Sequence, residues 1–167
     1  MLAPRLAALL SDGHGLLLGV LAHQRGHALP LRGEDVPVHW REGRYVRAGL
    51  EDEGIVLQLP ERASDAQLKA GLRDFYQQQA RQDLGAWLPR YLPGLPRAPR
   101  QFTLRPLSSL WGSLSPSDEL KLDLSLVLGR PAAFEYVLVH ELCHLVHANH
   151  SRAFWREVEA RWPGWRE

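Results

Sequence analysis

Cysteine, methionine and net charge are all scarce in this sequence. Cys143 is the only cysteine among 167 residues, and Met1 is the only methionine. A single cysteine excludes an intrachain disulfide and is typical of a reducing compartment. The formal net charge is only +1, so charge does not favour strong binding to nucleic acid or to an anionic membrane.

Long hydrophobic runs are missing as well. No stretch approaches the roughly 20 apolar residues that a membrane-spanning helix requires. The apolar residues within 1–10 lack the basic segment and the length of a signal peptide. We therefore expect a cytoplasmic protein that has no membrane partner.

The composition is that of an ordinary globular domain. Hydrophobic residues make up 45% of the chain and charged residues 23%, which is typical of soluble proteins. A length of 167 residues suffices for one domain with a hydrophobic core and is short for two. We expect a single domain over residues 1–167, and nothing in the sequence indicates its oligomeric state.

Residues 1–60 form a predicted N-terminal β region. Short apolar runs at 16–21, 45–46 and 55–59 are separated by turns rich in glycine and charged residues, a spacing typical of short strands. We expect a small antiparallel meander. The histidines of this region lack the spacing of metal ligands and are expected at the surface. They are His14, His23, His27 and His39.

A long scaffold helix is predicted for residues 64–90. Ser64 and Gln67 have the spacing of a capping box, in which two side chains satisfy the first free backbone N–H groups of a helix. Apolar residues then recur along one helical stripe, and we expect Pro89 to end the helix. The stripe consists of Leu68, Leu72, Phe75, Leu84, Trp87 and Leu88. The proline-rich stretch 89–100 is then a rigid connector.

Residues 101–167 are the predicted C-terminal core. Segments 102–104 and 120–124 have the composition of strands that pair with each other. Strict alternation in the second indicates one buried face and one face toward water or a ligand. Pro131 suits the first turn of a following helix. The patterns together predict an α+β fold, in which a small mixed or antiparallel sheet packs on this second helix.

The second helix carries His140-Glu141-Leu142-Cys143-His144. Two histidines four residues apart point from one helix face, and with a carboxylate beside them they are typical of a zinc site that activates water. Leucines cover the opposite side of the helix, so the histidines can face a cleft while the helix packs on a core. We expect the helix to end near Asn149, and Ser151 to cap a further helix.

Two ligands from one helix turn leave a zinc site incomplete. A third ligand has to arrive from another direction, and a catalytic zinc keeps its fourth position for water. His150, beyond the predicted helix end, is our candidate third ligand beside His140 and His144, with one Zn²⁺ per chain. Glu141 is the candidate general base that takes a proton from the water and later passes it to a leaving amine.

Other side chains near the motif leave alternatives open. Glu157 and Glu159 are alternative third ligands, although they follow His144 too closely for a return from a second helix. His147 lies on the metal-facing side one turn on, which favours a cleft or ligand-supporting position over direct ligation. The plain alternative to any site is a row of histidines on a solvated helix face.

Several segments around the motif form a wider pattern. They are residues 136–145, Asn149-His150-Ser151, Phe154-Trp155 and Pro163, preceded by Trp111-Gly112-Ser113 with Ser115. Over about residues 102–165 this pattern resembles the YgjP-like metallopeptidases, relatives of the SprT and WLM zincins. The resemblance implies a zincin-like α+β fold with a catalytic core at 101–167, a single zinc, and hydrolysis of a peptide or protein substrate. It also implies that residues 120–124 are the edge strand beside the cleft, where an extended peptide can add as a further strand.

The chain departs from that family's usual pattern at three positions. It has Leu110, Leu114 and Asp123 where the family usually has arginine, cysteine and asparagine. None is a predicted zinc ligand, so the departures concern the wall of the cleft and the choice of substrate. The further candidate residues of the cleft or of the ligand-supporting shell are Trp111, Asp123, His147 and Asn149.

Three functional hypotheses follow. The first is a zinc metallopeptidase. The second is an endoribonuclease, because the histidine spacing also resembles the YbeY-type enzymes; those have glycine at the position of Glu141, and the near-neutral charge does not favour RNA. The third is a non-catalytic zinc-binding module, recruited to DNA or to a complex as SprT-like proteins are, with zinc held by four protein ligands.

Overall fold

The computed structural model describes residues 28–166. The predicted strand at 16–21 and the histidines His14, His23 and His27 lie outside this range. Within it, two small sheets and three α-helices form an α+β fold, as predicted. In chain order the elements are β1 (Ala28–Leu31), β2 (Glu34–Glu42), β3 (Arg47–Glu51), β4 (Gly54–Leu59), α3 (Asp65–Tyr91), the 3₁₀ helix η1 (Leu92–Gly94), β5 (Gln101–Arg105), β6 (Gly112–Leu114), β7 (Glu119–Asp123), the 3₁₀ helix η2 (Leu124–Leu128), α4 (Pro131–Cys143) and α5 (Arg152–Arg161).

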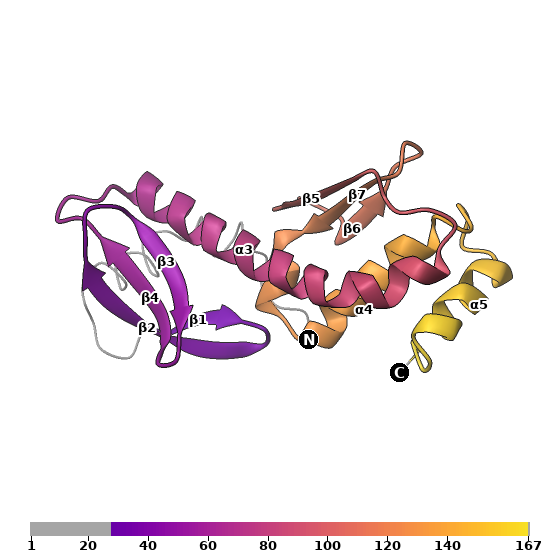
Figure 1. Cartoon of the computed structure of the whole chain (residues 1–167), viewed down its shortest axis with the longest axis horizontal. Helices are drawn as coiled ribbons and strands as arrows, with labels where there is room; N and C mark the ends of the chain where they lie inside the picture. Colours follow the sequence, from indigo (N-terminus) through magenta and orange to yellow (C-terminus); the bar gives the residue numbers. More distant parts are fainter. Residues whose placement is uncertain (1–27, 167) are drawn as a thin grey trace.

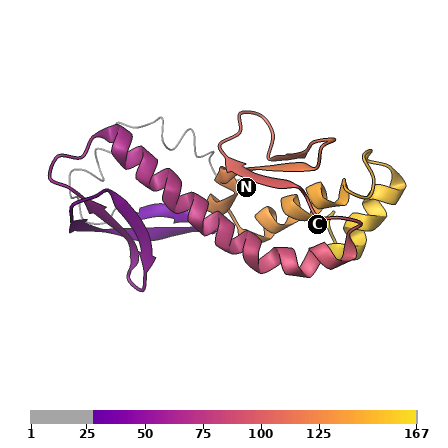
Figure 2. The same ribbon diagram turned by 45° about the horizontal axis from the view of Figure 1, so that its top comes forward.

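Helix α3 runs the length of the molecule and joins its two ends (Figure 1). The four-stranded sheet lies at one end, while the three-stranded sheet, α4 and α5 lie toward the other, as Figure 2 also shows. The hydroxyl of Tyr76 donates to the backbone carbonyl of Pro30 at 2.9 Å. Arg32 forms an ion pair with Asp83 at 3.0 Å. These contacts fix the N-terminal sheet to the middle of α3.

The N-terminal sheet has the order β1-β2-β4-β3, which corrects the predicted antiparallel meander. The β1–β2 and β3–β4 pairs are antiparallel, whereas β2 and β4 are parallel, with Val38 opposite Ile55. Strand β4 is the most buried of the four, because its continuous apolar run favours the central position over an edge. Gly54 permits this arrangement, since a Cβ there would clash with the carbonyl oxygen of Pro37 in β2.

Helix α3 begins as predicted and ends later than predicted. The capping box is present, with Gln67 N donating to Ser64 Oγ at 3.2 Å and Ser64 N donating to the Gln67 side chain at 3.0 Å. The helix passes through Pro89 and ends at Tyr91. The hydroxyl of Tyr91 donates to Glu135 of α4 at 2.6 Å, and this tertiary contact holds the last turn although Pro89 cannot donate a backbone hydrogen bond.

The second sheet has the order β5-β7-β6. The predicted pairing of 102–104 with 120–124 is confirmed, in parallel register. The predicted edge position of 120–124 is wrong, because β7 is the central strand and β6 pairs with its other side. Leu120 and Leu122 are buried as the alternation predicts. The edge strand that faces α4 is therefore β6, which has only three residues.

The motif lies at the end of α4, and α5 follows it. Pro131 is the first residue of α4, and Ser151 caps α5 by accepting a hydrogen bond from Phe154 N at 3.3 Å, both as predicted. The predicted end of α4 near Asn149 is wrong, because the helix ends at Cys143. A tighter turn replaces it, in which Val146 N donates to the carbonyl of Cys143 at 3.0 Å. The early end frees the following residues to return toward the helix.

The leucine face of α4 is buried, as predicted. Phe134, Leu138, Leu142 and Leu145 have exposed fractions of at most 4%. They pack in one hydrophobic core with α3, the central strands of both sheets and η2. Within residues 28–166, no helix combines the length and the apolar character needed to cross a membrane.

Candidate metal centre

Three histidines converge at the end of α4. His140 and His144 come from the helix, and His150 comes from the segment that leads to α5. Their nitrogen ligand atoms all lie within 4.8 Å of one another, and the Nε2 atoms of His140 and His150 are 3.2 Å apart. Tetrahedral zinc with bonds of about 2.0–2.1 Å would separate two nitrogens by about 3.3 Å. The separation of His140 and His150 therefore fits a shared zinc ion, and His144 lies close enough to join them.

The backbone orients one of these rings. The Nδ1 atom of His144 lies 3.1 Å from the carbonyl oxygen of His147, and because a carbonyl only accepts, Nδ1 is the donor. A hydrogen bond at Nδ1 leaves Nε2 free for a metal and fixes the ring orientation. The early end of α4 makes this contact, since His147 lies in the turn. The ligand-supporting atom of His147 is thus its backbone oxygen.

Aromatic side chains of α5 back the histidine cluster. Phe154 stacks on His144 at 4.5 Å between ring centroids, and Trp155 stacks on His150 at 5.7 Å. Trp165 in turn stacks on Trp155 at 4.2 Å. The rings limit the rotation of the two ligands and keep one side of the site apolar.

Burial favours the neutral form of the imidazoles. It lowers the pKa of His140 to about 4, with a smaller contribution from the neighbouring His144 and His150. The pKa of His144 is also lowered, chiefly by burial. A metal binds only the neutral ring, so at neutral pH His140 and His144 need not lose a proton to bind one.

Glu141 lies beside the cluster and outside it. Its side chain is buried, with an exposed fraction of 8%, and burial raises the pKa of its carboxyl to about 7. Among the described residues, His140, His144 and His150 bring their possible metal-ligand atoms close together, and the Glu141 carboxylate is not part of this group. It nevertheless lines the same cleft as the three histidines.

The cleft has a volume of about 740 Å³. Its walls come from β6 and the following turn, from the end of α4, and from Arg97 of the connector before β5. The lining residues are Arg97, Leu110, Gly112, Ser113, Leu114, Ser115, Pro116, Asp118, His140, Glu141, His144, Ala148 and His150. The edge strand β6 and the histidines thus face a common space.

A model of the YgjP-like metallopeptidase domain matches residues 22–167 of the sequence. The chain belongs to this family. The crystal structure of the metallopeptidase zymogen of Pyrococcus abyssi abylysin is similar, with 27% sequence identity, a TM-score of 0.39, and coverage of 54% of this chain and 82% of that one. No curated protein sequence matches the chain.

The alternative metal ligands lie elsewhere in this YgjP-like chain. Glu157 pairs with Arg161 at 2.7 Å on the same helix. Glu159 lines a different pocket. Their positions leave His150 as the candidate third ligand.

Two of the three departures from the family pattern line the cleft. Leu110 and Leu114 do so, and they make this part of the wall apolar. Asp123 is fully buried and accepts a hydrogen bond from Ser125 N at 2.9 Å, which caps η2. A buried capping carboxylate does not face a substrate, so Asp123 does not line the cleft, and a ligand-supporting role for this residue stays a prediction.

The side chains of the other three candidates, Trp111, Asn149 and His147, do not line the cleft. Trp111 packs against the hydrophobic core and accepts a hydrogen bond from Asp123 N through its carbonyl at 2.9 Å. Asn149 is exposed in the turn before His150. His147 supports the site through its backbone, and its side chain is not part of the cleft wall.

Sequence reasoning missed two features of the cleft. Arg97 forms an ion pair with Asp118 at 2.6 Å, and both residues line the cleft. No motif marks this pair, because its members are 21 residues apart in two loops. Gly112 was recognised only as part of the resemblance, although a Cβ at this position would lie 3.0 Å from Glu141 Cγ. Its side-chain hydrogen is what allows β6 to approach Glu141.

For peptide cleavage, the activity expected of a metallopeptidase domain, Gly112→Ala should lower kcat by about 10-fold. The added methyl displaces the Glu141 carboxylate by a few tenths of an ångström. Zinc content should not change, since no histidine is touched. The matched control is Gly49→Ala in β3, where a Cβ meets nothing within 4 Å. Steady-state kinetics with zinc analysis of both variants checks this; an unchanged kcat in Gly112→Ala would contradict the role of the close approach.

Proposed function

We propose that this YgjP-like chain is a zinc-dependent peptidase in which His140, His144 and His150 hold the metal and Glu141 is the general base. The observation that carries the proposal is the convergence of three histidines on one cleft that a buried, non-ligating carboxylate also lines. When bound, zinc supplies a Lewis acid that lowers the pKa of water toward neutrality.

In this proposal Glu141 carries the proton transfer at the metal site. As the water oxygen bonds to the peptide carbonyl carbon, the Glu141 carboxylate takes one proton from the water. When the carbon–nitrogen bond breaks, the same carboxyl group gives that proton to the leaving amine. Burial of Glu141 keeps bulk water away from its carboxyl, which strengthens its interaction with the reacting atoms.

The edge of β6 supports a peptide as the substrate. In the described sheet, one side of β6 pairs with β7 and the strand ends the order β5-β7-β6. All three residues of β6 line the cleft. An extended peptide can add to such an edge through main-chain hydrogen bonds, which would place one of its bonds beside the histidines.

Removal of zinc tests the proposal. We expect a chelator to abolish cleavage of a proteome-derived peptide mixture, and one equivalent of zinc per chain to restore it, because no other described group replaces a metal at this site. Mass spectrometry of the digest gives the cleaved bonds. Cleavage by the metal-free protein would contradict the proposal, and cleavage of RNA without cleavage of peptides would favour an endoribonuclease.

A further inference from the structure

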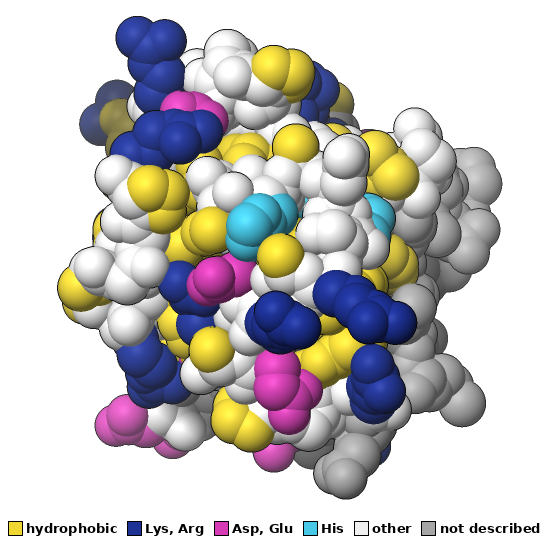
Figure 3. Space-filling view, turned by 90° about the vertical axis from the view of Figure 1, so that its right-hand side faces the viewer, with side chains coloured by type: hydrophobic (Ala, Val, Ile, Leu, Met, Phe, Trp, Pro, Cys, Tyr) yellow, Lys and Arg dark blue, Asp and Glu magenta, His cyan; other side chains and the backbone are white. Residues whose placement is uncertain are grey.

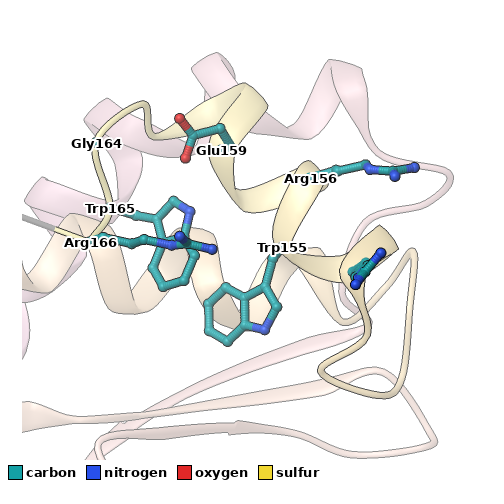
Figure 4. A pocket seen from close by; sticks show the side chains of 7 residues that line it. Trp155, Arg156, Glu159, Gly164, Trp165 and Arg166 are labelled. Atoms are coloured by element: carbon teal, nitrogen blue, oxygen red, sulfur yellow. The ribbon is translucent and has the colours of Figure 1, made fainter.

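A second pocket lies along α5, where Trp155, which stacks on His150, is one of its lining residues. It has a volume of about 600 Å³. Figure 4 shows Trp165 and Arg166 next to each other, Trp155 facing them from α5, and Arg156 on the other side of Trp155. The lining residues are Arg152, Trp155, Arg156, Glu159, Gly164, Trp165 and Arg166. The proposed metal site and its catalytic base do not use these arginines.

The pocket has an excess of positive charge. Three arginines line it against one glutamate. Within residues 28–166, no carboxylate forms an ion pair with Arg152, Arg156 or Arg166. The remaining arginine of α5 differs, because Arg161 is paired with Glu157 at 2.7 Å. Described carboxylates therefore do not occupy these three guanidinium groups, and Figure 4 shows the Arg156 side chain pointing away from Trp165 and Arg166.

The pocket is next to the proposed metal centre. Trp155 lines the pocket and also stacks on the His150 ring at 5.7 Å. Arg152 follows His150 by two residues. Figure 3 shows this end of the molecule, with Lys and Arg side chains gathered around hydrophobic side chains close to a histidine. A peptide that lies over the histidines would only have to extend past His150 to reach these arginines.

The chemistry of the pocket favours a carboxylate over a nucleic-acid base. Bases bind proteins by stacking on aromatic rings, but Trp155 is already stacked on His150 and Trp165. The guanidinium of Arg166 lies 5.0 Å from the centroid of the Trp165 ring and covers it. The free groups are the guanidinium forks, which match the geometry of carboxylates and of phosphates; of the two, a carboxylate is the one that a peptide supplies.

We propose that this arginine pocket is a subsite that binds an acidic side chain of the peptide substrate. The inference rests on the proposed peptidase function and specifies its substrate class. It predicts that cleaved peptides carry Asp or Glu at a fixed distance from the scissile bond. The preference should weaken with added salt, because exposed charges are screened.

The test compares two charge-matched double variants in zinc-loaded protein. Arg152→Gln/Arg156→Gln removes two charges from the pocket, and Arg62→Gln/Arg73→Gln removes two from exposed positions near the N-terminal sheet. Digests of one peptide mixture give the frequency of acidic residues at each position around the cut. We expect the preference for an acidic residue over its amide, as kcat/KM, to fall about 3- to 10-fold in the pocket variant. The control should keep it.

Binding measurements separate this inference from the peptidase function. The zinc-loaded wild type and the two double variants are each titrated with three fluorescent probes: hexaglutamate, hexaglutamine and a single-stranded oligonucleotide. If wild-type protein binds hexaglutamate selectively and the pocket variant does not, the subsite is supported, whether or not peptides are cut. If no peptide is cut, the proposed peptidase function is contradicted, but the subsite is not. Cleavage without acidic preference, or a preference kept by the pocket variant, overturns the subsite. Tighter binding of the oligonucleotide through the same arginines overturns it in favour of nucleic acid.

Discussion

Glu141→Gln is expected to lower kcat for peptide cleavage by about 10²- to 10⁴-fold, the range typical of a lost general base, and to leave zinc bound. The amide has the size of the carboxyl group but cannot take a proton from water. The three histidines proposed to hold the metal are unchanged, so the metal content should stay at one per chain. Kinetics and metal analysis on the same preparation give both quantities.

Glu135→Gln is the matched control for this variant. Glu135 is a second buried carboxylate of α4, with an exposed fraction of 9%, and it lies outside the cleft. It accepts hydrogen bonds from Tyr91 at 2.6 Å and Arg90 at 2.9 Å. Its substitution should destabilise the fold by about 1–3 kcal/mol and keep kcat. Full activity in Glu141→Gln would exclude Glu141 as the base.

His150→Ala should weaken zinc binding by more than about 100-fold. Loss of a supporting residue outside the ligand set already costs 10- to 100-fold, and His150 is one of three proposed ligands. Competition with a chelator of known affinity measures the change. The substitution leaves the two helix histidines in place, so the residual affinity reports on a two-ligand site.

Three variants near His150 serve as controls. His147→Ala should change zinc affinity little, because the hydrogen bond from His144 goes to the backbone oxygen of this residue, which the substitution keeps. Glu157→Gln should cost the ion pair with Arg161 and leave zinc bound, as should Glu159→Gln. Undiminished zinc affinity in His150→Ala, together with a loss in either glutamate variant, would assign the third ligand to α5.

The sequence predicted those parts of the fold that rest on local patterns. The capping box at Ser64, the first turn at Pro131 and the cap at Ser151 depend on side chains a few residues apart, and the structure contains all three. The parallel β2–β4 pair and the central place of β7 depend on contacts between distant segments. Local periodicity carries no information about strand order, and the three-residue strand β6 is too short to show a period.

In the candidate site, too, the sequence predicts the features that depend on local spacing and not those that depend on the packing of distant segments. The spacing of His140 and His144 places them on one helix face, and the turn that follows brings His150 to them. A sequence does not give the burial of a side chain, so it allows Asp123 either in the cleft or in the ligand-supporting shell, and the structure buries this residue fully. The closeness of Gly112 to Glu141 and the pairing of Arg97 with Asp118 arise only when distant segments pack together.

A crystal structure of the zinc-loaded protein, with anomalous data at the zinc edge, is the decisive test of the proposed metal site. We expect one zinc bound by the Nε2 atoms of His140, His144 and His150 at about 2.0–2.1 Å, with a water in the fourth position. Glu141 should lie beside that water and not on the metal. A fourth protein ligand in place of water, or a glutamate of α5 in place of His150, would contradict it.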